Sequence, residues 1–350
     1  MRWNSSFGSA EVLCVGNRHA RHDIVQPRKR LCRSFLSPWK DENGNYKWYG
    51  RQNLGVVTLN LPDVALTAKG DLDMFWNILD RRLELCKEAL MVRVDLLRGT
   101  PSDISPIHWQ YGAVARLKKG ETIDSIIDSG ACSISLGYIG LCETVRALIG
   151  QSHTTPEGEK LAVAIMKRLR ESTDRWKQET GLGFGLYGTP SESLTYRFAT
   201  KLQQRHGIID GITDKLYLTN SYHVHVCEEI DAFSKMAFES QFQKISSGGT
   251  ISYIEVPNMK HNLEALHRTV EFMYENMQYC EINTKSDYCQ ECGYDGEILI
   301  DDELEWYCPN CGNRDKSKMN VVRRTCGYLG ENFFNKGRTQ EIKERVLHLN

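Results

Sequence analysis

Four cysteines have the types and spacing of a metal site. Cys289 and Cys292 form one Cys-x-x-Cys pair, and Cys308 and Cys311 form a second. Each pair can make a tight turn that points two thiolates at one place, and two such turns give the tetrahedral sulfur cage that zinc prefers. Because all four positions are cysteine, no ligand position stays open for water. The spacing therefore predicts a structural zinc site.

Other interpretations of these cysteines stay open at this point. An iron–sulfur cluster or a redox-active dithiol uses the same residue type, and four unrelated buried thiols need no metal. Gly293 and Gly312, which follow the two pairs, favour the metal site, because glycine suits a turn whose backbone N–H groups face the sulfurs. Taken alone, a zinc ribbon is more typical of nucleic-acid or protein-binding modules than of enzymes.

The composition limits the classes of partner. Of the 350 residues, 41% are apolar and 25% charged, and the formal net charge is −1. This is ordinary globular composition with no basic field for nucleic acid, so we expect no polynucleotide partner. No apolar run suits a membrane span and residues 1–30 lack the apolar region of a signal peptide, so we expect a cytoplasmic protein. Its twelve cysteines are then metal ligands, catalytic thiols or buried thiols rather than disulfides.

The elements that position these residues follow from the hydrophobic pattern. Residues 56–66 and 131–139 indicate buried strands, with Pro62 ending the first. Apolar residues at helical spacing predict one helix over 71–98. Strands that alternate with long helices are typical of an α/β protein with a parallel sheet or barrel. Further strands are expected at 181–188, 221–227 and 251–255, and further helices at 156–181, 190–206, 258–276 and 339–349.

A glycine in the segment Arg324-Thr325-Cys326-Gly327-Tyr328 follows the cysteine pairs. A radical at a glycine Cα is stabilised by the adjoining amide groups when the centre is planar, and a side chain would crowd that planarity. By itself the segment is equally a β-turn. With the cysteines before it and Phe334-Asn335-Lys336-Gly337 after it, the segment resembles the anaerobic ribonucleoside-triphosphate reductases, a glycyl radical enzyme family. The resemblance implies a radical on Gly327.

The segment Cys32-Arg33-Ser34-Phe35-Leu36-Ser37-Pro38-Trp39 resembles the finger loop of these reductases, whose cysteine carries a transient thiyl radical. The resemblance implies that Gly327 and Cys32 exchange a hydrogen atom and that Cys32 then takes the 3′ hydrogen of the ribose. It also places Ser34 near the substrate. An isolated Cys-Arg-Ser-Phe would indicate a buried structural cysteine, and the pairing with the Gly327 segment favours the radical role.

Residues 50–62 resemble the family's strand after the finger loop. Asn53 then takes the position of an active-site asparagine that can hydrogen-bond the ribose hydroxyls or the reductant. From the residues alone, Asn53 is equally a turn residue before a strand. We expect Cys32, Asn53 and Glu192 to converge at one end of the barrel.

The segment from Tyr187 to Ser193 has a helix-start pattern. Thr189 as N-cap, Pro190 at the first helical position and Glu192 form a capping box, and free N–H groups at such a start can bind a phosphate. Capping alone also explains the pattern. The segment resembles a family segment that lines the substrate pocket, which implies that Tyr187 and Glu192 lie near substrate and formate. Thr189 is a third candidate for binding substrate.

The resemblance covers roughly residues 31–350 and implies an incomplete glycyl-radical-enzyme α/β barrel over 31–281, a zinc ribbon over 282–318, and a glycyl radical loop with a terminal helix over 319–350. Residues 1–30 form an atypical amino-terminal segment. The implied reaction reduces ribonucleoside triphosphates to 2′-deoxyribonucleoside triphosphates with formate, after a radical S-adenosylmethionine activase installs the radical. The family's allosteric nucleotide-binding region and first barrel strands are not represented. We therefore expect a fragment that is inactive alone, is completed by a separate amino-terminal chain, and forms a homodimer when complete.

Two alternatives belong to other classes. Glycyl radical enzymes of the pyruvate formate-lyase type use adjacent paired cysteines on the finger loop and lack a four-cysteine ribbon, whereas Cys32 stands alone here. A non-catalytic zinc-ribbon protein would not need the long α/β segment, and it would want a basic surface that the net charge does not offer.

Overall fold

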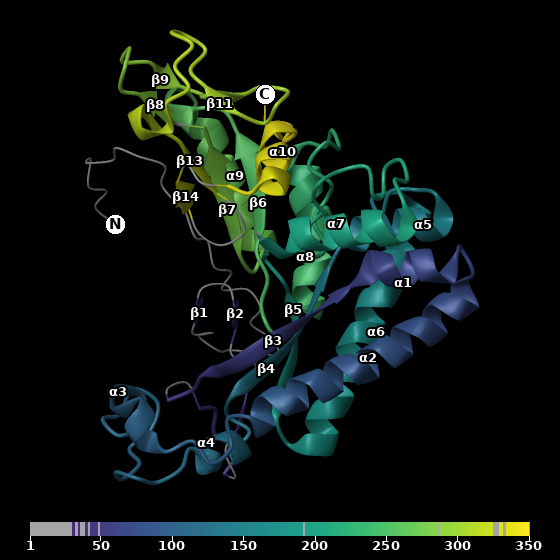
Figure 1. Ribbon diagram of the computed structural model, residues 1–350, viewed down its shortest axis with the longest axis vertical. Coiled ribbons are helices and arrows are strands. Elements are labelled where there is room, and N and C mark those ends of the chain that lie inside the picture. The colour runs from purple at the N-terminus through teal and green to yellow at the C-terminus, as the bar shows by residue number, and fades with distance from the viewer. Residues whose placement is uncertain are drawn as a thin grey trace. The chain divides into compact units, whose positions relative to one another are not determined.

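The chain divides into two compact units (Figure 1). We call Arg21–Thr189 with Phe242–Thr250 the sheet unit, and Pro190–Gln241 with Ile251–Asn350 the cysteine unit. No helix in the described ranges is long and apolar enough to cross a membrane. The computed structural model describes residues 30–31, 34–35, 39–40, 43–47, 50–191, 193–285, 287–324, 329–331 and 334–349.

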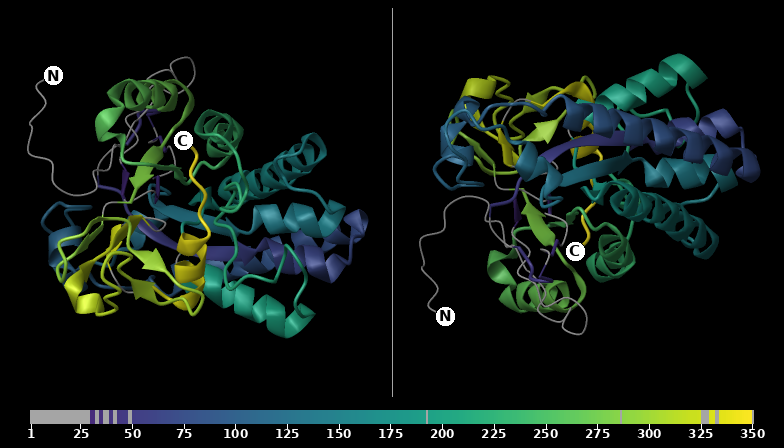
Figure 2. Two further views of the ribbon diagram at one scale, coloured as in Figure 1. Left: turned by 90° about the horizontal axis from the view of Figure 1, so that it is seen from above. Right: turned by 90° about the horizontal axis from the view of Figure 1, so that it is seen from below.

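A three-stranded parallel sheet forms the centre of the sheet unit. Its strands are β3 (Asn53–Asn60), β4 (Ser133–Ile139) and β5 (Gly183–Gly188), in that order. Figure 2 shows β3 and β4 running side by side. Every residue of β4 is buried, as expected for a central strand covered on both faces. The strand predicted over 131–139 is thereby confirmed, and the parallel strands between helices confirm the α/β class.

Two long helices cover this sheet, α2 (Leu72–Asp95) against β3 and α6 (Pro156–Thr180) against β5. Asp71 caps α2 by accepting a hydrogen bond from the Met74 amide at 2.9 Å. The helices predicted over 71–98 and 156–181 are confirmed. The buried apolar residues of α2 lie at helical spacing, namely Phe75, Leu79, Leu83, Cys86, Leu90 and Val94.

The strand expected over 56–66 ends early. Leu61 begins helix α1 (Leu61–Ala68), with Pro62 in its first turn. Proline fits this position because the first amides of a helix have no intrahelical acceptor. Pro62 therefore ends the strand by starting a helix. The remaining elements of the sheet unit are α5 (Leu141–Ile149), η1 (Ser102–Ile104), α3 (Pro106–Trp109), α4 (Asp124–Asp128), β1 (Arg30–Leu31) and β2 (Ser34–Phe35).

The cysteine unit contains a second, two-stranded parallel sheet, β6 (Ser252–Val256) and β7 (Cys280–Thr284). Helix α9 (Leu263–Asn276) connects these strands and lies alongside them in Figure 1. The unit also holds η2 (Met259–His261), α7 (Ser193–His206) and most of α8 (Ala232–Ile245). A small apolar core joins β6, α8 and α9, made of Ala232, Met236, Ile254, Val256, Met273, Met277 and Cys280.

The four cysteines lie among short strands, with Cys289 ending one strand and the other three in the turns or just after a strand. The three-stranded sheet β12-β8-β9 and the hairpin β10-β11 surround a second core that contains Cys289, Cys308 and Trp306. The hairpin β13-β14 and helix α10 follow. These elements are β8 (Asp287–Cys289), β9 (Asp295–Gly296), β10 (Leu299–Ile300), β11 (Trp306–Tyr307), η3 (Lys316–Lys318), β12 (Met319–Asn320), β13 (Val322–Arg324), β14 (Leu329–Glu331) and α10 (Lys336–Lys343).

Two expected elements differ in this unit. Residues 221–227 form turns rather than a strand, and Ser221 has a left-handed φ of 42°. The helix expected over 339–349 ends at Lys343. After it the Val346 amide donates to the Val226 carbonyl at 3.0 Å and the His348 amide to the Glu255 carbonyl at 2.9 Å. These bonds to distant strands and turns replace the helical ones.

Candidate functional site

The four cysteines converge on one point. Cys289, Cys292, Cys308 and Cys311 have sulfurs within 4.8 Å of one another, with Cys289–Cys311 at 3.8 Å and Cys292–Cys308 at 3.7 Å. A tetrahedral zinc ion with Zn–S bonds of about 2.3 Å separates its sulfurs by about 3.8 Å, so this cage has the size that the ion needs.

The two Cys-x-x-Cys turns have the same backbone structure. The amide of Gly293 donates to the Cys289 carbonyl, and the amide of Gly312 donates to the Cys308 carbonyl, each at 2.9 Å. Both glycines have a φ of 72°, a left-handed conformation that residues with side chains rarely adopt. The sequence prediction that these glycines shape the turns is confirmed.

Electrostatics favour a cation in the cage. Burial alone would raise the pKa of Cys289, but hydrogen bonds from the backbone and from Asn313 lower it to about 6. The pKa of Cys311 rises to about 12 despite a backbone hydrogen bond from Asn313, because the other three sulfurs crowd it. Four sulfurs this close cannot all be thiolates without a positive charge between them. The residues therefore fit a divalent metal ion.

A hairpin directly after this cage frames the glycine segment. Strands β13 and β14 pair in antiparallel register, with Arg324 opposite Leu329. Gly327 lies in 325–328, between these paired residues and outside the described ones.

Buried ion pairs hold the base of this hairpin. The Arg323 guanidinium makes a two-pronged pair with Asp287, two residues before Cys289, and Arg324 pairs with Glu281 on β7. All four side chains are buried. The hairpin base is thereby tied both to the cysteine cage and to the parallel pair of strands.

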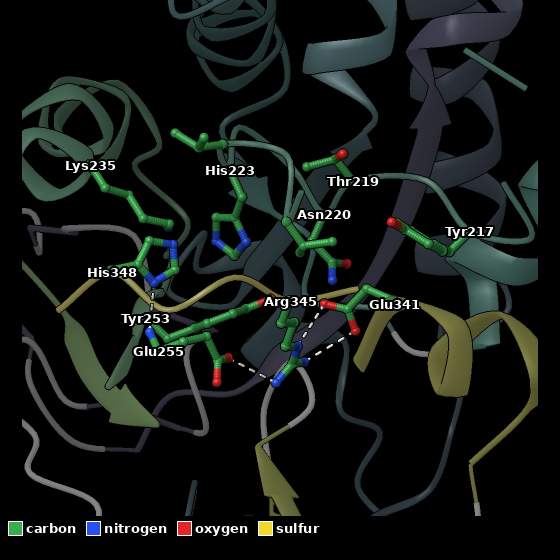
Figure 3. Close-up of a pocket in the computed structure, with 12 residues that line it drawn as sticks. Tyr217, Thr219, Asn220, His223, Lys235, Tyr253, Glu255, Glu341, Arg345 and His348 are labelled. Atoms are coloured by element: carbon green, nitrogen blue, oxygen red, sulfur yellow. Dashed lines mark hydrogen bonds and ion pairs between the residues drawn. The ribbon is translucent and has the colours of Figure 1, made fainter. Parts of the chain in front are cut away.

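A small polar cavity of about 20 Å³ lies in the same unit (Figure 3). This volume suits about one water molecule. Arg345 lies at its edge, with Nε and Nη2 donating to Glu341 at 3.1 Å each and Nη1 donating to Glu255 at 3.0 Å. Burial alone would raise the pKa of Glu341, but Arg338 and Arg345 lower it to about 2.

Two neutral histidines complete the cavity. His223 Nε2 lies 2.7 Å from the Ile251 carbonyl, which can only accept, so this nitrogen carries the hydrogen. His348 Nδ1 accepts from the Glu255 amide at 2.8 Å. Burial lowers the pKa of each histidine to about 4. Lys235, also buried, donates to Glu239 at 2.5 Å.

The carboxyl end of the sheet holds two residues expected near substrate. Register aligns Thr58, Gly137 and Tyr187 across the three strands. The hydroxyls of Thr58 and Thr189 meet at 3.2 Å, and a Cβ added to Gly137 would lie 2.0 Å from Thr189 Oγ1. Glycine in β4 is thus what allows the two hydroxyls to meet. Ligands bind at this edge in open parallel sheets.

Asn53 lies elsewhere. It begins β3 opposite Ser133, which pairs with Gly183, so Asn53 is at the amino end of the sheet and Tyr187 at the carboxyl end. Its Oδ1 accepts from the Gly55 amide at 2.9 Å. The expected convergence of Asn53 with Cys32 and Glu192 stays a prediction. Cys32 and Glu192 lie outside the described residues, and Ser34 is described only as part of the short strand β2.

The expected capping box differs as well. The Leu194 amide donates to Ser191 Oγ at 3.0 Å, so Ser191 caps α7 in place of Thr189. Thr189 instead contacts Thr58. Sequence reasoning also missed Arg345 and His348 as members of the cavity. The only sequence signal was the spacing of Arg338, Glu341 and Arg345, which places all three on one helical face.

Comparisons with known proteins agree on one family. A family model described as anaerobic ribonucleoside-triphosphate reductase matches residues 5–348. The protein of that name from Salmonella typhimurium is 44% identical over 324 residues, which cover 91% of this chain and 45% of that protein. The one from Enterobacteria phage T4 is 40% identical over 325 residues, covering 91% and 52%. A solved structure titled "Anaerobic ribonucleotide reductase" matches with a TM-score of 0.66 at 21% identity, over 90% of this chain and 48% of that one. This chain spans about half the length of these relatives.

Proposed function

Because this chain belongs to the anaerobic ribonucleoside-triphosphate reductase family, we propose that it carries the radical-bearing part of such an enzyme. The reaction is the anaerobic reduction of ribonucleoside triphosphates to 2′-deoxyribonucleoside triphosphates for DNA synthesis. The observation that carries the proposal is the cysteine cage followed by a hairpin paired around residues 325–328. In this proposal Gly327 holds the radical.

The proposed chemistry passes a radical from Gly327 to Cys32 and then to the substrate. An activating enzyme that uses S-adenosylmethionine removes one hydrogen atom from the Gly327 Cα. The glycyl radical then takes the hydrogen atom of the Cys32 thiol, and the resulting thiyl radical takes the 3′ hydrogen of the ribose. Formate supplies two electrons and one hydrogen and becomes carbon dioxide, while the 2′ hydroxyl takes up one proton and leaves as water. Cys32 then returns the hydrogen atom to C3′, and the re-formed thiyl radical takes the hydrogen atom back from Gly327.

Five residues are proposed around the substrate. Asn53 hydrogen-bonds the ribose hydroxyls or formate, and Ser34 lies beside the substrate. Tyr187, Thr189 and Glu192 bind substrate and formate. The position of Tyr187 and Thr189 at the carboxyl end of the parallel sheet supports their part of the proposal. The roles of Asn53, Ser34 and Glu192 are proposed from the family alone, since Asn53 begins the sheet at the end opposite to Tyr187.

Zinc is the proposed ion in the cysteine cage, because the sulfur separations match it and all four ligands are thiols. Its role is structural, since the protein ligands fill its coordination. The proposed partners are the activating enzyme and a second copy of the enzyme. The twelve cysteines suit the reducing cytoplasm.

Electron paramagnetic resonance tests the radical. The chain is incubated anaerobically with activating enzyme, S-adenosylmethionine and an electron source, together with the amino-terminal part of a longer relative. We expect a glycyl doublet that collapses when the protein is grown on α-deuterated glycine. Gly327→Ala should abolish it, and oxygen should cleave the chain at Gly327. Neither signal nor cleavage in the complemented sample would contradict the assignment.

Turnover tests the thiyl step separately. Cys32→Ser should keep the glycyl signal and lose all reduction of ribonucleoside triphosphates with formate, because the serine O–H bond is too strong for a carbon radical to break. The matched control is Cys86→Ser, a buried cysteine on α2 away from the proposed chemistry. Loss of turnover in the control but not in Cys32→Ser would refute the role of Cys32.

A further inference from the structure

Arg345 joins four separate parts of the cysteine unit through one side chain. It follows α10, binds Glu341 on that helix with two parallel hydrogen bonds, and reaches Glu255 on β6. Its Nη1 also donates to the main-chain carbonyl of Arg324 at 2.9 Å. The Arg345 side chain is 1% exposed, so these bonds are made without competition from bulk water.

The Arg324 carbonyl lies at the point where the main chain leaves β13 and enters the segment that contains Gly327. It belongs to the last described residue before 325–328, and its residue pairs with Leu329 on the other side of that segment. The Arg324 side chain is held independently by Glu281. Residue 324 is thus fixed through its side chain, its strand pairing and its carbonyl.

We infer that Arg345 is a positioning residue for the segment that contains Gly327, because its guanidinium fixes the carbonyl at which the chain leaves β13. This inference rests on the proposed radical role of Gly327. A glycine radical must be placed accurately against its partners, and a misplacement on the order of 1 Å can cost roughly a hundredfold in rate. Arg345 supplies this placement from outside the hairpin.

Arginine is required here for a geometric reason. Nη1 uses one hydrogen for Glu255 and the other for the Arg324 carbonyl, while Nε and Nη2 hold Glu341. A lysine ammonium keeps the charge but has one nitrogen, so it cannot span all three acceptors. Arg345→Lys therefore removes the guanidinium that holds the Arg324 carbonyl, and it keeps the positive charge beside Glu255 and Glu341.

The chain offers a matched control in Arg338. It lies on α10, is buried, and donates to the same Glu341, at 2.5 Å, but its Nη2 donates to the Ser191 carbonyl at 2.7 Å and to Thr195 Oγ1 at 3.5 Å. Arg338→Lys thus makes the same chemical change at the same carboxylate. A purely structural effect of disturbing Glu341 would be shared by both variants, whereas anchoring of the hairpin belongs to Arg345.

Hydrogen–deuterium exchange of the full zinc-loaded chain measures the anchoring directly. In Arg345→Lys, amides of 322–324 and 329–331 should exchange about tenfold faster or more, the loss expected for one hydrogen bond to a charged donor. Arg338→Lys should change them much less, because the bonds of Arg338 to Ser191 and Thr195 lie outside the hairpin. Equal zinc content shows that both variants are folded around the cage. Equal hairpin exchange in wild type and Arg345→Lys overturns the inference.

The radical gives the functional readout. Under the activation conditions above, Arg345→Lys should hold several-fold less glycyl radical than wild type, and Arg338→Lys should approach wild type. Full radical yield in Arg345→Lys overturns the positioning role. If wild type itself yields no radical, the proposed function fails, and the exchange measurement still decides whether Arg345 anchors the hairpin.

Discussion

The two units bury different kinds of side chain. In the sheet unit the centre is apolar: Leu136 on β4, Phe184 on β5 and Leu169 on α6 are all within 1% of complete burial. In the cysteine unit Arg323 and Arg338 are among the largest fully buried side chains, and each is paired with a carboxylate. The sheet unit is held mainly by removal of apolar surface from water, whereas the cysteine unit adds buried charge pairs and a cage of thiols to its two apolar cores.

This difference indicates which unit should lose stability when the metal, the charges or the pH are changed. Apolar burial does not depend on protonation or on a metal. Buried ion pairs contribute little net stability, because desolvation offsets attraction, but they fix one arrangement and are costly to break. The cysteine unit, which contains the proposed radical segment, should therefore respond to metal, charge and pH in ways that the sheet unit does not.

Removing the metal should give the largest effect. Cys308→Ser should lower bound zinc from about one ion per chain to none and unfold residues 287–324, because zinc binding contributes on the order of 10 kcal/mol to folding in small zinc modules. Metal analysis and hydrogen exchange measure this. The apolar strand β4 should keep its protection. Equal loss of protection in both units would contradict the comparison, as would full zinc content in the variant.

Breaking a buried ion pair should come second. Arg323→Met leaves Asp287 buried without its partner and should lower the free energy of unfolding by about 3–5 kcal/mol. Adding Asp287→Asn should recover part of this loss. Urea unfolding measures both. The surface control is Arg268→Met, whose pair with Glu264 is 70% and 76% exposed and should contribute less than about 1 kcal/mol. Similar losses from both arginines would contradict the prediction.

Acid should weaken the cysteine unit through His223. Burial lowers the pKa of folded His223 to about 4, whereas the unfolded chain has the ordinary value of 6.5. Between these values only the unfolded chain binds the proton, so stability falls as the pH drops from 6.5 towards 4. The full shift corresponds to about 3 kcal/mol. His223→Gln should reduce the acid sensitivity measured by urea unfolding at pH 7 and pH 5, and the exposed His267→Gln should not. Identical pH dependence of stability in both variants would refute the role of His223 in acid sensitivity.

Crowding the sheet should give the smallest effect. In Gly137→Ala the new methyl group would meet the Thr189 and Thr58 hydroxyls, and we expect a loss of about 1–3 kcal/mol that does not change with zinc or between pH 7 and 5. Adding Thr189→Ala, which removes the hydroxyl nearest to the new methyl group, should restore part of the lost stability. Thermal unfolding measures the change, and a zinc-dependent loss would contradict it.

Periodicity and spacing predicted the parts that depend on local pattern. The apolar rows of α2 and α6 and the cage of four cysteines follow from residues close together in the sequence. Residues 221–227 look like a strand, but Ser221 turns the chain and His223 bonds to a distant carbonyl. The helix expected to 349 stops because its last residues bond to other segments.

The ion-pair network could not be predicted for the same reason. Arg345 and Glu255 are 90 positions apart, and Arg323 and Asp287 are 36 apart, so no local spacing indicates that they meet. The position of Asn53 depended on strand register, which the sequence pattern left open. Contacts between residues that are distant along the chain are not indicated by local sequence patterns and are seen only in the structure.

The order of translation gives the Arg345 contact a further consequence. The ribosome releases the four cysteines and both strands of the hairpin before it releases Arg345. The four cysteines can therefore come together while the Arg324 carbonyl still lacks its guanidinium partner. The last of the contacts that hold residue 324 can form only when synthesis has passed α10.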